Sequence, residues 1–504
     1  MGRPVLRHPA LRRHALPGSV FLLLAFVALI TWATGSDGPS AGAGSVVPRT
    51  VPVTGVVRDC PPPAPGTDQA HIALLSAPPR PVSSAGSVSS AGTGSSARAA
   101  KAPGATTLTA IPAADANGTA SGTASGPAAP GALGFLSPPQ ASQGTQVAAT
   151  GGLAQGFAAQ QADADGTSVV TCTHPDSDEW FVGTGTNSRL YLMNTSAMTA
   201  SVDVTVLTDT GVQSSQDNEV TVPAHRYLSV NLASEASGST VLAVHVQTSV
   251  GQIAADVWQD GGSGGAWLPV AEPLATQVVL PGVTTQGGTA KLLVAVPGGQ
   301  DAQLRVVALT AGGKSVPLGA APQEALAGAA SSFPLNSLGT SAATLVVTSS
   351  VPVTAGVQVP GNGIGGFTAA AAPLTGQGLV AGNPSGGGDT VGLALSAPGA
   401  PVRAAITVIP SSDSERVVPP PQQTLTVQSG HTVQVAIAPP KGTSGPFAIL
   451  VTPRPGSGPL YAARMVLSGG NGLSGPLRSL LIVPSAPSAV QLPPASDSYS
   501  AVNP

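Results

Sequence analysis

The chain has 504 residues, of which 42% are hydrophobic, 9% charged and 3% aromatic, and its formal net charge is −3. So few charges exclude a long coiled coil, which needs abundant Glu, Lys and Arg, and the slight negative charge argues against a partner nucleic acid, which clustered basic residues would bind. The 63 glycines and 50 prolines approach a low-complexity composition, although the hydrophobic content is that of a folding chain.

The N-terminus carries the features of an export signal. Four arginines precede the first acidic residue, and a hydrophobic stretch follows them: Arg3, Arg7, Arg12 and Arg13, then 16–34. We predict a basic cytoplasmic tail over 1–15 and a membrane helix over 16–34, which make this a single-pass membrane protein with its C-terminal part outside the cell. A cleaved signal peptide, and hence a secreted protein, is the alternative.

Cys60 and Cys172 are the only cysteines of the chain. Because an even number of cysteines in an oxidising compartment favours pairing, we predict one disulfide between them, with two free thiols as the alternative. Residues 50–60 are predicted to form a strand, which this bond would hold against the first folded domain. No neighbouring histidine pair completes a zinc site.

Between 76 and 166 the composition falls mainly to Ala, Gly, Ser, Thr and Pro. Such a segment offers little apolar area to offset the entropy lost on ordering, so we predict a flexible, disordered low-complexity linker. A second segment of this kind, at 485–504, is predicted to be a disordered tail.

The region after the linker contains a repeat of about 100 residues. Its opening strands begin at positions 190, 292 and 392, and an alternating strand follows each of them: Leu190–Asn194, Leu292–Val296 and Gly392–Ser396, then Val202–Leu207, Leu304–Leu309 and Val402–Ile409. Period-two alternation between turn residues is typical of strands in sandwiches and barrels. The predicted repeats cover 169–275, 276–374 and 375–484.

These features predict an all-β protein with three tandem immunoglobulin-like β-sandwiches. About seven strands per 100 residues suit that fold. A β-propeller is the alternative, because each repeat could hold two four-stranded blades.

Several segments together carry a family resemblance: the single N-terminal span, Cys60-Pro61-Pro62-Pro63, the segment from Cys172 to Trp180-Phe181-Val182-Gly183, and strands like Leu190–Asn194 and Val220–Ala224. With these the chain resembles an uncharacterised family of actinobacterial envelope proteins, a domain of unknown function. The resemblance implies an exported, membrane-attached, β-rich protein, and it carries over no catalytic residue.

Three motifs resemble known functional sites, and each favours a structural interpretation. Gly38–Gly42 fits the G-x-S-x-G pattern of hydrolases but lacks the flanking strand and helix. Gly361–Gly366 resembles a phosphate-binding loop but lies between strands. The polar run His174–Trp180 could bind a cation, yet its spacing fits a solvated turn better. No catalytic residue, cofactor or metal ligand is therefore predicted.

The tryptophans provide the remaining candidate. Trp180 and Trp258 are predicted to fill the first core, whereas Trp267 is flanked by glycines and is predicted to be exposed, as a contact for a partner. His245 is predicted to face away from the core. We expect a non-enzymatic interaction or scaffold protein of the cell envelope, with an unknown envelope protein or glycan as partner. The alternatives are a glycan-binding accessory protein in cell-wall polymer assembly and a hydrolase with an unrecognised site.

Overall fold

The structure is a computed structural model that describes residues 49–492 except for 68–69, 79–103, 117–122, 128, 141, 164–165, 167, 186, 214–218, 262–263, 336–337, 340, 387, 412–421, 442–444 and 470–471. The predicted cytoplasmic tail, the membrane helix and the Gly38–Gly42 pattern lie outside these residues. Within them, no helix has the length and apolar character needed to cross a membrane. The larger of two compact units is Val51–Val490, and of the smaller one only the ends of β1 (Arg49–Pro52) and β35 (Ala489–Leu492) are described.

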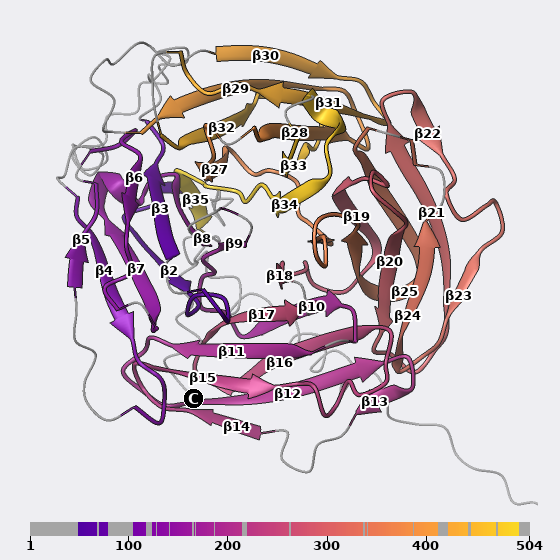
Figure 1. Cartoon of the computed structure of the whole chain (residues 1–504), viewed down its shortest axis with the longest axis horizontal. Helices are drawn as coiled ribbons and strands as arrows, with labels where there is room; N and C mark the ends of the chain where they lie inside the picture. The colour runs from indigo at the N-terminus through magenta and orange to yellow at the C-terminus, as the bar shows by residue number, and fades with distance from the viewer. Residues whose placement is uncertain are drawn as a thin grey trace, which may run out of the picture. The chain divides into compact units, whose positions relative to one another are not determined.

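The larger unit contains four β-sandwiches, each built from about 100 residues and two antiparallel sheets (Figure 1). The first has the sheets β2-β7-β4-β5 and β6-β3-β8-β9, with the bounds β2 Gly55–Cys60, β3 Ala70–Ser76, β4 Thr106–Ile111, β5 Thr123–Ser125, β6 Gly134–Leu136, β7 Gly144–Thr150, β8 Phe157–Asp163 and β9 Val169–Thr171.

The second sandwich has the sheets β10-β16-β12-β14 and β15-β11-β17-β18, and β13 also pairs with β12. The bounds are β10 Asp178–Gly183, β11 Ser188–Asn194, β12 Ala200–Thr208, β13 Gly211–Gln213, β14 Glu219–Val222, β15 Arg226–Asn231, β16 Leu242–Val250, β17 Ala254–Asp260 and β18 Gly265–Leu268.

In the third sandwich one long strand, β25, serves both sheets. Its first half pairs with β19 and β21, and its second half pairs with β20 and β26. The bounds are β19 Ala275–Val283, β20 Ala290–Val296, β21 Ala302–Thr310, β22 Gly313–Ser315, β23 Gln323–Ala325, β24 Ala329–Leu335, β25 Ala343–Val359 and β26 Gly366–Ala369.

The fourth sandwich has the sheets β27-β32-β29-β30 and β31-β28-β33-β34. The bounds are β27 Gly378–Asn383, β28 Thr390–Ala397, β29 Val402–Pro410, β30 Gln422–Val427, β31 His431–Ile437, β32 Phe447–Pro453, β33 Tyr461–Leu467 and β34 Leu477–Ile482.

The same strand order recurs in all four sandwiches. With the main strands numbered one to eight, the sheets run 1-6-3-4 and 5-2-7-8. The prediction of an all-β fold is confirmed. The immunoglobulin fold shares the neighbours 2–5 and 3–6, but there strand 7 lies in the sheet of strands 3 and 6, whereas here it pairs with strand 2. The expected immunoglobulin topology is therefore only partly present.

Hydrophobic alternation explains why these residues form sandwiches. In β12, Val202, Val204 and Val206 are buried, while the residues between them are only half-buried. Each sandwich thereby presents one apolar face of each sheet to the other sheet, which gives a core of the kind that sheets pack around.

The linker predicted over 76–166 is wrong for the residues that the structure describes there. Strands β4 to β8 lie within this range, and they belong to the first sandwich, whose core includes Leu108, Val147 and Phe157. The prediction failed because small residues such as Ala and Thr pack between the sheets here, and a few large apolar side chains complete the core. The residues that the structure describes thus form four sandwiches rather than three.

Other boundaries change for the same reason. Strand β9, assigned to the first predicted repeat at 169–275, is the last strand of the additional sandwich. The strand predicted at 50–60 to dock on the first domain is β2, and β2 is the first strand of this additional sandwich. The predicted disordered tail at 485–504 contains β35, and its Ala486 is buried and donates its backbone N–H to Gln377.

Within the larger unit, each sandwich contacts the next, and the fourth contacts the first. The sheet of β3 and β8 packs on that of β27 and β32, β28 and β33 face β19, and β20 faces β10. The sheet of β11 and β17 faces the first sandwich through Ile111 and Val170. Eight four-stranded sheets therefore follow one another face to face. This succession agrees with the propeller alternative, but each sheet draws its strands from about 100 residues, not from the 40–50 of one blade.

Candidate functional site

Two sets of connections meet at one end of the sandwiches. One set joins strand one to strand two of each sandwich, and the other joins strand seven to strand eight. We call the surface that these connections form the turn face. Neighbouring sandwiches contact each other there: Asn362 donates its backbone N–H to the carbonyl of Leu477 at 2.9 Å, and Gln286 Nε2 donates to the carbonyl of Leu473 at 3.1 Å. Both bonds join the third sandwich to the fourth. The last strands of the sandwiches, which begin at this end, also contact one another in succession (β9, β18, β26 and β34), so four sandwiches contribute to one surface.

The glycine-rich segment Gly361–Gly366 belongs to this face, between β25 and β26. A Cβ on Gly361 would lie 2.5 Å from the carbonyl oxygen of Leu477, so the close approach of the third and fourth sandwiches needs glycine here. Gly365 has a φ of +81°, which also favours glycine. These glycines therefore serve backbone packing, in keeping with the expected loop between strands.

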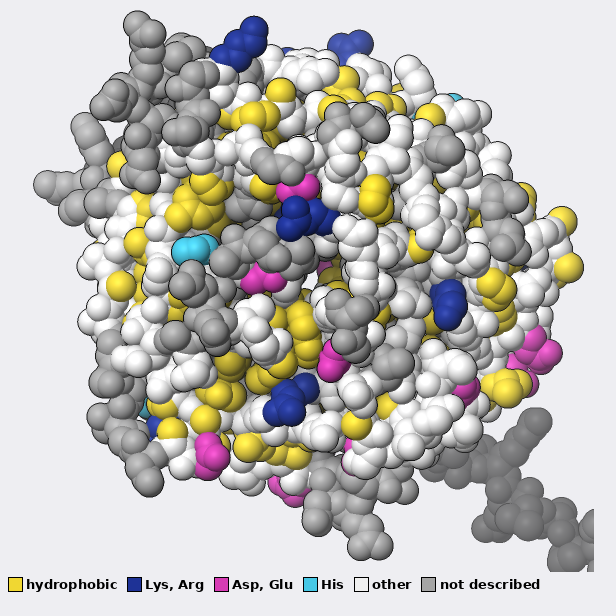
Figure 2. Space-filling view, in the orientation of Figure 1, with side chains coloured by type: hydrophobic (Ala, Val, Ile, Leu, Met, Phe, Trp, Pro, Cys, Tyr) yellow, Lys and Arg dark blue, Asp and Glu magenta, His cyan; other side chains and the backbone are white. Residues whose placement is uncertain are grey.

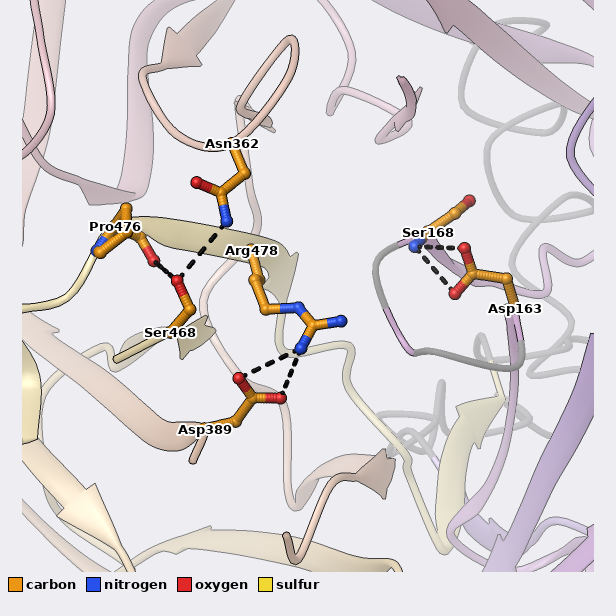
Figure 3. Close-up of polar contacts among 7 residues, drawn as sticks. All are labelled: Asp163, Ser168, Asn362, Asp389, Ser468, Pro476 and Arg478. Atoms are coloured by element: carbon orange, nitrogen blue, oxygen red, sulfur yellow. Dashed lines mark hydrogen bonds and ion pairs between the residues drawn. The ribbon is translucent and has the colours of Figure 1, made fainter. Parts of the chain in front are cut away.

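An ion pair lies beside this contact (Figure 3). Arg478, on β34, donates through Nη1 to both carboxylate oxygens of Asp389, at 2.9 and 3.2 Å. Asp389 lies in the connection between β27 and β28, so the pair joins this connection to the start of β34 within the fourth sandwich. Figure 2 shows that charged side chains are otherwise few and scattered on the displayed face.

A small pocket lies at the same end of the first sandwich. It is lined by residues of the first sandwich and one of the second: Ala64, Thr67, Ala70, Gln161, Ala162, Asp163, Ser168 and Trp267. Both carboxylate oxygens of Asp163 accept from the backbone N–H of Ser168 at 3.0 Å, as Figure 3 also shows. This contact fixes the turn between β8 and β9.

Two polar side chains that line this pocket are buried, and each has one polar atom without a hydrogen-bond partner among the described residues. Gln161 is 3% exposed and donates through Nε2 to the carbonyl of Pro61 at 3.0 Å, and Ser168 is 6% exposed. Among the described residues, Gln161 Oε1 and Ser168 Oγ have no hydrogen-bond partner. Since buried polar atoms are rarely left without a partner, these two atoms mark the pocket as a candidate binding site.

The expected exposure of Trp267 is wrong. Its side chain is only 7% exposed, because it packs against Trp258 with ring centroids 5.2 Å apart and against Tyr191 at 5.7 Å. Ala64 and Val170 of the first sandwich complete this cluster. The glycines that flank Trp267 indicated a loop, but the sequence did not reveal the sandwich that covers it.

Trp180 and His245 form a second aromatic pair. Trp180 belongs to the large core of the second and third sandwiches, and the imidazole of His245 stacks on it with ring centroids 4.1 Å apart. His245 Nε2 also lies 3.1 Å from Asp178 Oδ1. Trp258, by contrast, packs at the contact with the first sandwich.

The polar run His174–Trp180 does not gather its carboxylates. Asp176 is close to His174, at 3.2 Å, and Asp178 is close to His245. Glu179 is instead buried, and its Oε2 accepts from the backbone N–H of Ala255 at 2.9 Å. No group of three or more His, Cys, Asp or Glu side chains that could hold a metal ion occurs in the part of the chain that the structure describes.

Sequence reasoning missed a set of buried carboxyl groups at the contact between the first and second sandwiches. Burial raises the pKa of Asp59 to about 7, although the hydroxyl of Thr195, which donates to its Oδ2 at 3.0 Å, lowers it. Burial also raises the pKa of Asp256 well above its usual value, and the charge of Asp59 raises it further. The pKa of Glu179 is raised by burial and then by Asp256. Alternating strands carried no signal that these groups would meet.

Cys60 and Cys172 form a disulfide in the structure, with a sequence separation of 112. The bond joins the end of β2 to the segment after β9, so it connects the first and last strands of the first sandwich. Both sulfur-bearing residues are buried in its core.

Comparison with known proteins gives one match. The family of unknown function DUF5719 matches residues 136–438, which is more than half of the chain. The chain belongs to this family. The DUF5719 match begins at the end of β6 and ends just after β31, so it includes all of the second and third sandwiches and parts of the other two. No curated protein and no solved structure matches the chain.

Proposed function

We propose that this protein is a non-catalytic binding protein of the cell envelope, held at the membrane by residues 16–34, with its sandwiches outside the cytoplasm. Its turn face would bind an envelope component. The observation that carries the proposal is the meeting of four equivalent sandwiches on one surface. There the strands β9, β18, β26 and β34 contact one another in succession, and Asn362 and Gln286 join the third sandwich to the fourth.

Two properties support this proposal. Turns held by a rigid β scaffold are common positions for binding residues, because the scaffold limits the entropy lost on binding. The Cys60–Cys172 disulfide is of the kind that persists in an oxidising compartment, as expected of an exported protein.

Co-sedimentation with purified cell wall tests the proposal. The full chain, in a detergent without a sugar headgroup, is mixed with wall material either untreated or stripped of protein by protease. We expect the protein to pellet with untreated wall. Pelleting with stripped wall as well would identify a glycan, and pelleting with untreated wall alone would identify a protein partner.

A pair of variants assigns binding to the turn face. Asn362 is exposed on the turn face, and Gln300 is exposed at the other end of the same sandwich, between β20 and β21. Asn362→Trp should reduce the pelleted fraction several-fold, whereas Gln300→Trp should leave it unchanged. The proposal fails if the wild type does not pellet or if both variants pellet as the wild type does.

A further inference from the structure

We infer that the pocket at the end of the first sandwich binds a hydroxyl group of a neutral saccharide. This inference rests on the proposed function and names the ligand class. It starts from the two buried polar atoms without a partner, Gln161 Oε1 and Ser168 Oγ, which line the same pocket.

Gln161 occupies a position that belongs to the interior of the sandwich. It pairs with Ile72 on β3 and with Val170 on β9, and Ile72 belongs to the core of the first sandwich. In the second and third sandwiches, the residue at the same place is apolar: Val257 pairs with Leu190, and Val357 pairs with Leu292. The fold therefore accepts valine here, and the glutamine is not required for packing.

Ser168 is likewise polar where other sandwiches have a small apolar residue. It precedes Val170, the residue that pairs with Gln161, by two positions. The equivalent residues are Ala266 in the second sandwich and Gly366 in the third, counted from Leu268 and Thr368. Of the other three sandwiches, only the fourth has polar residues at both positions, Arg464 and Ser479. There Arg464 Nη1 donates a hydrogen bond to Ser479 Oγ at 2.9 Å. In the first sandwich the matching pair leaves both oxygens available to a third group.

The chemistry of the lining selects the ligand. Gln161 Oε1 can only accept a hydrogen bond, whereas a serine hydroxyl can donate or accept, so an O–H group of the ligand satisfies both atoms. The carboxylate of Asp163 disfavours an anionic sugar. The rest of the lining, Ala64, Ala70 and Trp267, is apolar, and the pocket has room for about one hydroxyl group, so the remainder of the sugar would lie outside it.

Isothermal titration of the full chain, in a detergent without a sugar headgroup, tests this inference. The probes are glucose, galactose, mannose and arabinose, with glucuronate as the anionic control and methylamine as a cationic one. We expect heat of binding with at least one neutral sugar and none with glucuronate or methylamine.

Two variants assign the binding to the pocket. Gln161→Val and Ser168→Ala should each weaken sugar binding at least fivefold, while Ser249→Ala, an exposed serine on β16, should not. Thermal unfolding of each variant checks its fold. Gln161→Val is expected to fold, because valine occupies this position in two sandwiches, but to unfold at a somewhat lower temperature than the wild type, because the carbonyl of Pro61 loses the hydrogen bond from Gln161 Nε2.

The inference is overturned if no neutral sugar binds, if methylamine binds instead, or if both pocket variants bind sugar as the wild type does. In each of these cases the proposed function still stands if the wild type pellets with cell wall. Loss of pelleting together with retained sugar binding would instead contradict the proposed function alone.

Discussion

Asp59 is fully buried at the contact between the first and second sandwiches, beside a second buried carboxyl group, Asp256. Arg58, next to it in β2, is the charged group that lowers its pKa, and Asp59 in turn raises the pKa of Asp256 on β17. Asp59 Oδ1 and Asp256 Oδ2 have no hydrogen-bond partner among the described residues. Burial therefore favours the protonated form of both groups.

This arrangement predicts a pH dependence of stability. A carboxyl group whose pKa rises from 3.8 in the unfolded chain to about 7 in the folded protein contributes fully below pH 4, and its contribution is lost as the pH rises to about 7. The loss for Asp59 is at most about 4 kcal/mol, at roughly 1.4 kcal/mol per pH unit. Urea unfolding between pH 4 and pH 8 should show this decline, and Asp59→Asn should reduce it. An unchanged pH profile in Asp59→Asn would contradict the assignment.

Arg464 is the other unusual buried residue. It is 0% exposed and lies between Leu393 and Leu481 in the interior of the fourth sandwich. Burial lowers its pKa to about 10, and only Nη1 has a partner, the hydroxyl of Ser479. Within the described residues, Nε and Nη2 have none.

We therefore predict that Arg464→Met stabilises the protein. An apolar side chain of similar length removes the desolvation cost of a buried charge, so the free energy of unfolding should rise by about 1 kcal/mol or more. Chemical denaturation measures this change, with Ser479→Ala as a control that removes only the hydrogen bond. A decrease of more than about 1 kcal/mol in Arg464→Met would show that the guanidinium is compensated.

At the scale of elements, the first sandwich depends on a covalent bond between its first and last strands. On the chain-entropy model, a disulfide that closes a loop of this length contributes about 4–5 kcal/mol. Replacing Cys60 and Cys172 together by alanine should speed hydrogen exchange in β2, β3 and β8, while β28 and β33 of the fourth sandwich keep their protection. Equal loss of protection in the first and fourth sandwiches would show that the bond stabilises the whole unit instead.

The strands of the later sandwiches could be predicted from sequence because their second strands are short runs rich in large apolar residues and their third strands, such as β12, alternate apolar with polar residues. Leu190–Asn194, Leu292–Val296 and Gly392–Ser396 are equivalent second strands in the structure, as their spacing indicated. The first sandwich was missed because β7 and β8 use Ala, Thr and Gln at many positions, a composition that is also typical of linkers. Its alternation is visible only around Val147 and Phe157.

The candidate site was less predictable than the fold. Gly361–Gly366 and Trp267 were recognised as unusual segments, but the pocket residues Gln161 and Ser168 lay in the segment assigned to a linker. Their significance depends on the register that places them opposite Ile72 and beside Trp267. Such long-range pairing has no local sequence signal.

At the scale of the whole larger unit, one contact recurs at every junction. The end of the third strand in one sandwich meets the start of the fifth strand in the next, as in the bridges Ala113–Tyr227 and Leu133–Ser411 and in the contacts β13–β24 and β22–β31. The last of these junctions to form along the chain joins the fourth sandwich to the first. Because the fourth sandwich makes this contact with the first, the first sandwich must be folded for all four contacts to be present.

Hydrogen–deuterium exchange of the full chain tests the central claim, that the segment rich in small residues forms a fourth sandwich. The account predicts that the amides of β4, β7 and β8 exchange as slowly as those of β28 and β33, because they form equivalent paired strands. Complete exchange of 104–163 within seconds, with slow exchange retained in β28 and β33, would contradict it.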